Sequence, residues 1–161
     1  MTTPRPYTGI TDGISRTKRP GLEQLVASIQ YLTGGKLWNN GTHGIRTIRG
    51  GTRISVHATG RAADLSRRKM DTNRPGCSRA EALKIIQILI DHFDGLECVV
   101  DYDYNGTARV WKCDRMAWRT QTKGSISGSP GGDWFHIEIS PKYADDPKLI
   151  DQFWHDLLSG L

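Results

Sequence analysis

Residues 98–113 read CVVDYDYNGTARVWKC, and they carry the clearest β-hairpin signal in the chain. Asn105-Gly106 between two strand-like runs is typical of a two-residue turn, because both positions accept positive φ angles at low cost. Counting outward from this turn gives three expected cross-strand pairs: Tyr104–Thr107, Val100–Trp111 and Cys98–Cys113. The last pair would be hydrogen-bonded with Cα atoms about 5.5 Å apart, which a disulfide tolerates. Reduced thiols and a Cys98–Cys113 disulfide are therefore both open at this point.

Amphipathic patterns on either side of the hairpin predict helices, since their apolar residues recur at helical spacing. The three predicted helices run from Pro20 to the stop at Gly34-Gly35, from the capping box Ser78–Glu81 to Phe93, and from the cap Asp146 to Gly160. Short β-prone runs lie between them: Ile45–Ile48, Arg53–His57, Ala62–Ser66, Leu96–Asp103, Thr107–Cys113 and Trp134–Ser140. Their connections are hairpin-like rather than βαβ crossovers, which favours an α+β fold with about three helices on a mainly antiparallel sheet.

The composition is that of one globular domain. The chain has 161 residues, of which 37% are hydrophobic and 24% charged, and this balance fits neither a disordered chain nor a membrane bundle. We expect an extended N-terminal arm over residues 1–19, one domain over residues 20–161, and a Gly- and Ser-rich loop over Thr120–Gly132. The formal net charge of +5 predicts attraction to a polyanion without choosing which one.

The segment SVHATGRAADLS, residues 55–66, places His57 and Asp64 seven positions apart with Gly60 between them. On one helix the two side chains would lie about 10 Å apart along the axis, and on one strand more than about 20 Å apart. A turn over Ala58–Arg61 would instead let two adjacent strands present both side chains to one point. Both could then form metal bonds of about 2 Å.

The segment PGGDWFHIEIS, residues 130–140, alternates apolar and polar residues and predicts a half-buried strand. Its His136 would face away from the apolar side, and Asp133 would stand at the start of the strand. With His57 and Asp64, His136 completes a His, Asp, His set that leaves one position open on a tetrahedral Zn²⁺. Asp133 could then accept a proton as water attacks a carbonyl. We therefore expect one zinc site on the sheet.

Ser55 to Asp64 follow the pattern S-x-H-x-x-G-x-A-x-D, and Asp133 to His136 follow acidic-x-x-H. This pair of motifs resembles the zinc peptidases of the D-Ala-D-Ala carboxypeptidase and L-Ala-D-Glu endopeptidase family. The resemblance implies His57, Asp64 and His136 as the zinc ligands and Asp133 as the general base. Many members carry Glu at the base position, whereas phage endolysin members can carry Asp, so the chain is most similar to the phage type.

The family also has a G-Y-R segment before the first ligand, whose Arg binds and polarises the substrate. Gly44-Ile45-Arg46 stands at that place, so the resemblance implies Arg46 as a catalytic and substrate-binding residue. Arg49 and Arg53 are close enough in sequence to compete for this role. A guanidinium suits it because its planar donor fork can stabilise a developing oxyanion.

Ser55 and Trp134 are the remaining substrate-binding candidates, although either side chain could serve local hydrogen bonding or packing instead. Glu138 would either orient a ligand or face solvent as an ordinary strand carboxylate. His57 or His136 taken singly could be structural, and Asp64 could pair with Arg61. Asp133 could simply begin a turn. Three further histidines are expected to be structural or at the surface, with the first as a reserve ligand: His43, His92 and His155.

The resemblance implies a zinc-dependent peptidase that cuts a peptide bond in the peptidoglycan stem. We expect one Zn²⁺ per chain, peptidoglycan as partner, no nucleic acid, no membrane insertion and a monomer. A phage-type enzyme would be made in the cytoplasm without a signal peptide and reach the wall after holin-type release. The alternatives are a D-Ala-D-Ala carboxypeptidase or dipeptidase of the same family, a basic zinc nuclease, and an inactive zinc-containing binding module.

Overall fold

The computed structural model describes residues 3–122 and 131–160, which include four α-helices and a six-stranded antiparallel sheet. The α-helices are α1 (Pro20–Leu32), α2 (Arg79–His92), α3 (Pro141–Asp145) and α4 (Pro147–Ser159), and a 3-10 turn, η1, spans Val56–Thr59. The strands are β1 (Trp38–Gly41), β2 (Ala62–Ser66), β3 (Leu96–Tyr104), β4 (Thr107–Lys112), β5 (Ala117–Thr120) and β6 (Trp134–Ile139). The predicted α+β fold is confirmed. Part of the predicted Thr120–Gly132 loop, residues 123–130, lies outside the described residues.

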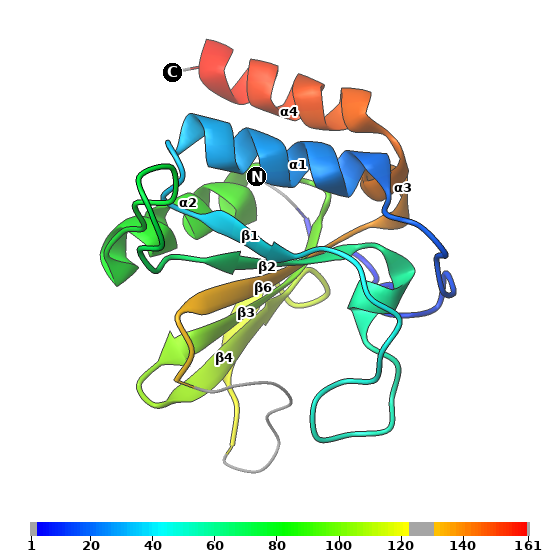
Figure 1. Cartoon of the computed structure of the whole chain (residues 1–161). Coiled ribbons are helices and arrows are strands. Elements are labelled where there is room, and N and C mark those ends of the chain that lie inside the picture. The colour runs from blue at the N-terminus through cyan, green and yellow to red at the C-terminus, as the bar shows by residue number, and fades with distance from the viewer. Residues whose placement is uncertain (1–2, 123–130, 161) are drawn as a thin grey trace.

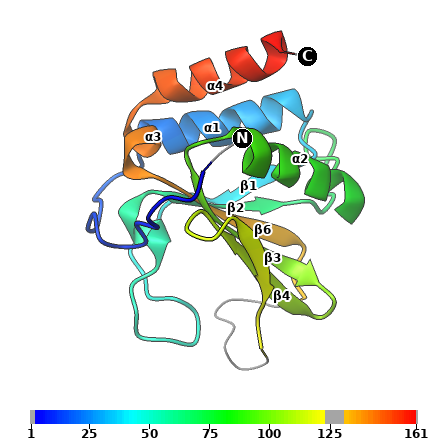
Figure 2. The same cartoon turned by 180° about the vertical axis from the view of Figure 1, so that it is seen from behind.

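The strands lie in the order β1-β2-β6-β3-β4-β5, so β2 and β6 are neighbours inside the sheet although far apart in sequence. One face of the sheet packs against α1 and α2 (Figures 1 and 2). The core between the sheet and these helices contains the fully buried strand residues Leu65, Phe135 and Ile137. Leu25 of α1 and Leu89 of α2 pack against them. Helix α4 packs on the outer side of α1 (Figure 1). The opposite face of the sheet carries polar side chains, among them Asp64, His136 and Glu138.

The helix signals in the sequence correspond to observed caps. Pro20 begins α1, where its missing N–H would have no partner in any case. The capping box of α2 is present, since Ser78 Oγ accepts from the Glu81 N–H and the Glu81 carboxylate accepts from the Ser78 N–H. Asp146 caps α4 by accepting from the Lys148 N–H. Among the described helices, none is both long and apolar enough to cross a membrane.

The predicted strands Ile45–Ile48 and Arg53–His57 are wrong. This segment forms only an isolated bridge between Thr47 and Ile54, flanked by backbone hydrogen bonds, and its last residues turn into η1. Ile45 is 62% exposed, so the first of the two runs does not bury its leading apolar residue. The short elements β1, β5 and α3 were not predicted from the sequence, because four or five residues give too little periodicity.

The predicted hairpin is confirmed at its turn, where Tyr104 pairs with Thr107, but not in its outer register. An irregularity between Asp101 and Tyr104 shifts the pairing by one residue, so Cys98 lies opposite Lys112 instead of Cys113. Because side chains alternate between faces, the shift sends the two cysteines to opposite sides of the sheet. All three cysteines of the chain are free, so no Cys98–Cys113 disulfide forms.

Candidate metal centre

His57 belongs to the 3-10 turn η1 rather than to a strand. Ser55 caps this turn, since its Oγ accepts from the His57 N–H at 3.3 Å. Gly60 ends the turn with a φ of 71°, a left-handed conformation that glycine adopts without strain. A Cβ at Gly60 would also lie 3.1 Å from Arg19 Cγ, so this position favours glycine for space as well. The predicted turn at Gly60 is confirmed, and it swings His57 back toward β2.

Asp64 and His136 come from β2 and β6, two adjacent inner strands of the sheet. They are directly opposite in the antiparallel pairing of β2 with β6, so their side chains leave the same face. That face is the one turned away from α1 and α2, because the alternate residues Leu65 and Phe135 point into the core. The His136 Nδ1 and Asp64 Oδ1 atoms are 3.0 Å apart.

The three residues form a cluster that could hold a metal ion. Their ligand atoms all lie within 4.8 Å of one another, and the rings of His57 and His136 meet edge to face with centroids 4.9 Å apart. Ligands about 2.05 Å from a tetrahedral ion are about 3.3 Å apart. The Nδ1–Oδ1 separation of 3.0 Å and the 3.3 Å from His57 Nε2 to Asp64 Oδ1 are close to that value.

The environment of His57 Nε2 also fits a metal ligand. This atom is buried and makes no well-aligned hydrogen bond with any described residue, although it faces the Asp64 carboxylate. A buried polar atom without a partner is costly, and coordination would remove the cost. The structure thus supplies two imidazoles and one carboxylate, the donor types of catalytic zinc sites. The predicted set of His57, Asp64 and His136 is brought together.

The charges in the cluster are strongly coupled. Burial lowers the pKa of His57 below its usual range. Burial would also lower the pKa of His136, but the carboxylates of Asp64 and Glu138 outweigh it and raise that pKa to about 10. Burial would raise the pKa of Asp64, yet its close contacts with His136 and His57 hold it well below the ordinary value. Without a metal, protonated His136 therefore forms an ion pair with the Asp64 carboxylate. A bound metal ion would displace this proton from His136.

Glu138 lies behind His136 and is only 6% exposed, so the solvent-facing alternative for this residue is wrong. Its Oε1 atom is 3.0 Å from His136 Nε2. A carboxylate at this place accepts the Nε2 proton and leaves the Nδ1 lone pair directed at the cluster. Arg61, which the sequence also allowed as a partner of Asp64, instead pairs with Asp12 and Glu97.

Asp133 immediately precedes β6 and contacts residues at the end of β2. Its Oδ1 accepts a hydrogen bond from Ser66 Oγ at 3.1 Å, and its Oδ2 is 3.7 Å from Arg68 Nε. Ser66 is two residues beyond Asp64 on the same face of β2, which corresponds to about 7 Å along the strand. Asp133 is therefore not one of the three clustered residues, and it lies toward the end of β2, two residues along the strand from Asp64.

Arg46 reaches the cluster from the loop between β1 and η1. Its guanidinium Nη2 is 3.8 Å from Asp64 Oδ2, and its side chain is 59% exposed. The loop is closed near this point, because the Ser55 N–H donates to the Arg46 carbonyl at 3.0 Å. An exposed cation at the rim of the cluster is suited to contact a bound ligand. The Ser55 side chain is different, since Ser55 is 7% exposed and its hydroxyl is used by the η1 cap.

Two aromatic residues flank the cluster. Trp134 is two residues before His136 on the same face, and its ring lies against Tyr102 with centroids 5.4 Å apart. Tyr102 of β3 was not predicted from the sequence. Its place follows from strand alternation, because Val100 pairs with His136 and Tyr102 shares the face of Val100. Burial, and then the negative charge of Asp64, raise the pKa of Tyr102 well above its usual range.

The other three histidines, all among the described residues, are not part of the cluster of His57, Asp64 and His136. His43 Nε2 is 3.0 Å from the Ser15 carbonyl oxygen, so this residue holds the N-terminal arm instead of a metal. His92 ends α2, and His155 is exposed beside Asp156 on α4. Comparisons of the chain with protein-family models, with curated proteins and with solved structures found no match.

Proposed function

We propose that this protein is a zinc-dependent peptidase that hydrolyses a peptide bond in the peptidoglycan stem, in the manner of a phage endolysin. The observation that carries the proposal is the convergence of His57, Asp64 and His136 on the sheet face turned away from α1 and α2. These are the three residues that the motif resemblance implies as zinc ligands. Arg46, the implied substrate-binding residue, is 3.8 Å from Asp64, and Asp133, the implied base, accepts a hydrogen bond from Ser66, two residues beyond Asp64.

In the proposed reaction, zinc supplies Lewis acidity that activates water and polarises a carbonyl. Asp133, as the resemblance implies, would take the proton of the attacking water. Arg46 binds the scissile carbonyl oxygen and stabilises its developing negative charge. Its guanidinium is mostly exposed and lies 3.8 Å from Asp64 Oδ2, so it can contact a substrate bound at the edge of the cluster. Trp134 and Tyr102, whose rings are in contact on the same face, would provide an apolar surface for the substrate.

The partner in this proposal is an anionic wall polymer. The net charge of +5 would raise the encounter rate with such a polymer, and the effect would weaken as salt is added. As the resemblance implies, the enzyme would be made in the cytoplasm and reach the wall after holin-type release.

The test is digestion of purified peptidoglycan from several wall types, followed by turbidity and by the masses of the released fragments. We expect peptide fragments from at least one wall, loss of activity with a chelator, and recovery when zinc is added back. The fragment masses would name the bond. His57→Ala is the inactive control, and His92→Ala, at the far end of α2, is the matched control that stays active.

Parallel reactions separate the rival functions. Release of D-Ala from D-Ala-D-Ala with intact walls would replace the endolysin function by the carboxypeptidase or dipeptidase of the same family. Chelator-sensitive cutting of plasmid DNA would favour the nuclease. One bound zinc per chain with no cleavage of any substrate would leave the inactive binding module and overturn the peptidase.

A further inference from the structure

We infer that Tyr7, in the N-terminal arm, is a positioning residue of the metal centre that acts through Glu138 on His136. The N-terminal arm here means residues 3–19, the described part of the chain before α1. The inference rests on the proposed zinc site and adds a residue to it. The N-terminal arm, with Tyr7 more than 120 positions before His136 in sequence, would then contribute to the metal centre.

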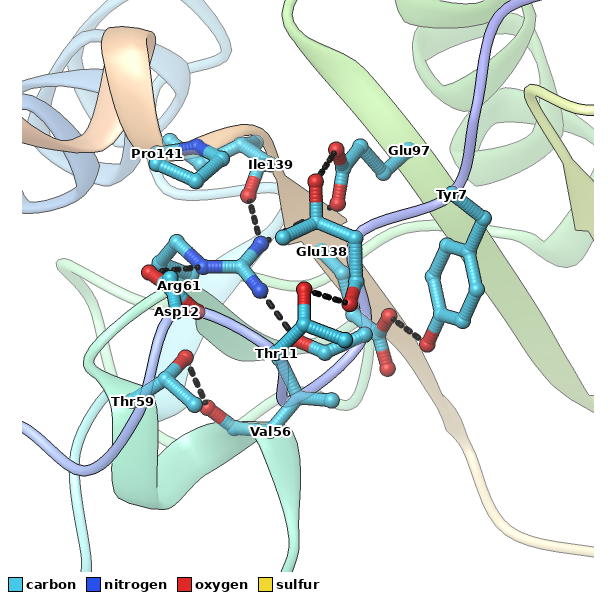
Figure 3. A network of polar contacts seen from close by, with 12 residues as sticks. Tyr7, Thr11, Asp12, Val56, Thr59, Arg61, Glu97, Glu138, Ile139 and Pro141 are labelled. Atoms are coloured by element: carbon cyan, nitrogen blue, oxygen red, sulfur yellow. Dashed lines mark hydrogen bonds and ion pairs between the residues drawn. The ribbon is translucent and has the colours of Figure 1, made fainter.

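The contacts form a continuous relay. The Tyr7 hydroxyl donates to Glu138 Oε2 at 2.5 Å, and Glu138 Oε1 is 3.0 Å from His136 Nε2. Each oxygen of the carboxylate thus has its own partner. Figure 3 shows the Tyr7 hydroxyl directed at the Glu138 carboxylate. A carboxylate held at both oxygens cannot rotate, so it fixes the plane of the imidazole and the nitrogen that carries the proton.

Tyr7 is itself held from two sides. Lys112 Nζ lies over its ring at 3.6 Å from the centroid, which is a close cation–π contact. Two residues earlier, the Arg5 N–H donates to the Cys113 carbonyl at 3.1 Å, so the arm follows the end of β4. Contacts with β4 and with the residue that follows it therefore fix the position of the Tyr7 side chain. This is the degree of order that a positioning role requires.

Further contacts anchor the arm independently of Tyr7. Thr8 Oγ1 donates to Glu97 Oε1 at 2.5 Å, and the buried Arg61 binds the Gly9 carbonyl and the Asp12 carboxylate. Figure 3 shows Arg61 at the centre of this group. Because Thr8 contacts Glu97 and not Glu138, it supplies a matched control. A variant at Thr8 loosens the arm without removing a group from the relay.

The experiment measures the dissociation constant of Zn²⁺ by competition with a chromophoric chelator. Tyr7→Phe removes only the hydroxyl, and we expect its zinc affinity to fall roughly fivefold to tenfold, at the lower end of effects seen behind metal ligands. Glu138→Gln should lose roughly tenfold to a hundredfold. The double variant should bind only about as weakly as Glu138→Gln alone, since residues of one relay are not additive. Thr8→Val should stay within about twofold of the unchanged chain, because it keeps both relay hydrogen bonds.

Three outcomes would overturn the inference. Unchanged affinity in Tyr7→Phe, while the unchanged chain binds zinc, would show that the hydroxyl does not position the ligand. An equal loss in Thr8→Val would assign the effect to the arm as a whole. Absence of zinc binding by the unchanged chain would instead remove the proposed function. If metal-free Tyr7→Phe is unfolded, the zinc dependence of its refolding, followed by circular dichroism, gives the same comparison.

Discussion

Asp64 and His136 lie directly opposite each other on β2 and β6, with Oδ1 and Nδ1 only 3.0 Å apart on the face turned away from the helices. Both belong to strands with a hydrogen-bonded neighbour on each side, so their backbone positions are set by the sheet. The pair is thus a preformed half of the metal centre. His57 completes it from η1, which is held by the Ser55 cap and by Gly60.

Removing the third ligand should abolish tight metal binding. We expect His57→Ala to lower bound zinc from one per chain to well below one, because two donors are left to coordinate the ion. In the unchanged chain, free zinc at a hundred times its dissociation constant should raise the free energy of unfolding by about 2.7 kcal/mol. Metal analysis and thermal unfolding with and without a chelator measure both effects. Equal zinc content in His57→Ala and His92→Ala would contradict the assignment.

Asp133→Asn should separate catalysis from metal binding. Asparagine keeps the shape of the side chain and can still contact Ser66, but it cannot accept a proton. We expect peptidoglycan hydrolysis to fall about a hundredfold or more while zinc content stays the same. Asp114→Asn, a partly exposed aspartate beyond β4, is the matched control. Loss of zinc from Asp133→Asn would instead make Asp133 a part of the metal centre.

Arg46→Lys should distinguish the competing arginines. The lysine keeps the positive charge but loses the planar donor fork, so we expect activity to fall roughly tenfold to a hundredfold. Arg49→Lys and Arg53→Lys should change activity by less than about threefold if Arg46 is the substrate-binding residue. Steady-state kinetics on a soluble stem peptide would give kcat and KM for each variant. A larger loss at Arg49 or Arg53 would move the role to that residue.

The capping box of α2 predicts a pH dependence of stability. A hydrogen bond from Lys36, and then those from Ser78, lower the pKa of Glu81 from 4.5 to about 2. A carboxylate with a lowered folded-state pKa stabilises the protein above pH 4.5, and this contribution is lost as the pH falls toward 2. Glu81→Gln should therefore be less stable than the unchanged chain near pH 6, and the difference should shrink below pH 4.5. Urea unfolding across this range tests it, and a pH-independent difference would contradict it.

Arg61 is fully buried and should be among the least replaceable residues of the chain. It pairs with Asp12 at 2.9 Å and with Glu97 at 3.1 Å. Arg61→Met would leave the buried Glu97 carboxylate without its charge partner, at a cost of about 3–5 kcal/mol in the free energy of unfolding. Adding Glu97→Gln should recover part of this loss. The exposed pair of Arg74 with Asp71 is the control, since Arg74→Met should leave the free energy of unfolding nearly unchanged.

Much of the candidate site was accessible from sequence because it depends on short-range signals. The turn at Gly60, the alternation along β6 and the spacing of His57, Asp64 and His136 are local properties, and they correctly predict which side chains meet. The three long helices were also predicted, since each has a cap and a sustained apolar stripe.

The errors come from interactions that local patterns do not contain. One extra residue between Asp101 and Tyr104 changes the register of the outer hairpin, and no residue type there signals it. The loop before η1 looks like two strands by composition, but its arms form only the single Thr47–Ile54 bridge with each other and join no strand of the six-stranded sheet. Tyr7 and Tyr102 approach the centre through long-range packing, so only the folded chain shows their proximity.

The position of β2 and β6 inside the sheet has a consequence for hydrogen exchange. Fraying begins at the outer strands β1 and β5, so the amides around Asp64 and His136 should exchange with solvent among the slowest in the protein. The loop before η1 lacks such a ladder, and its amides should exchange much faster. The two halves of the metal centre would then open on different timescales, with the His57 side released first and the Asp64–His136 side persisting until the sheet itself unfolds.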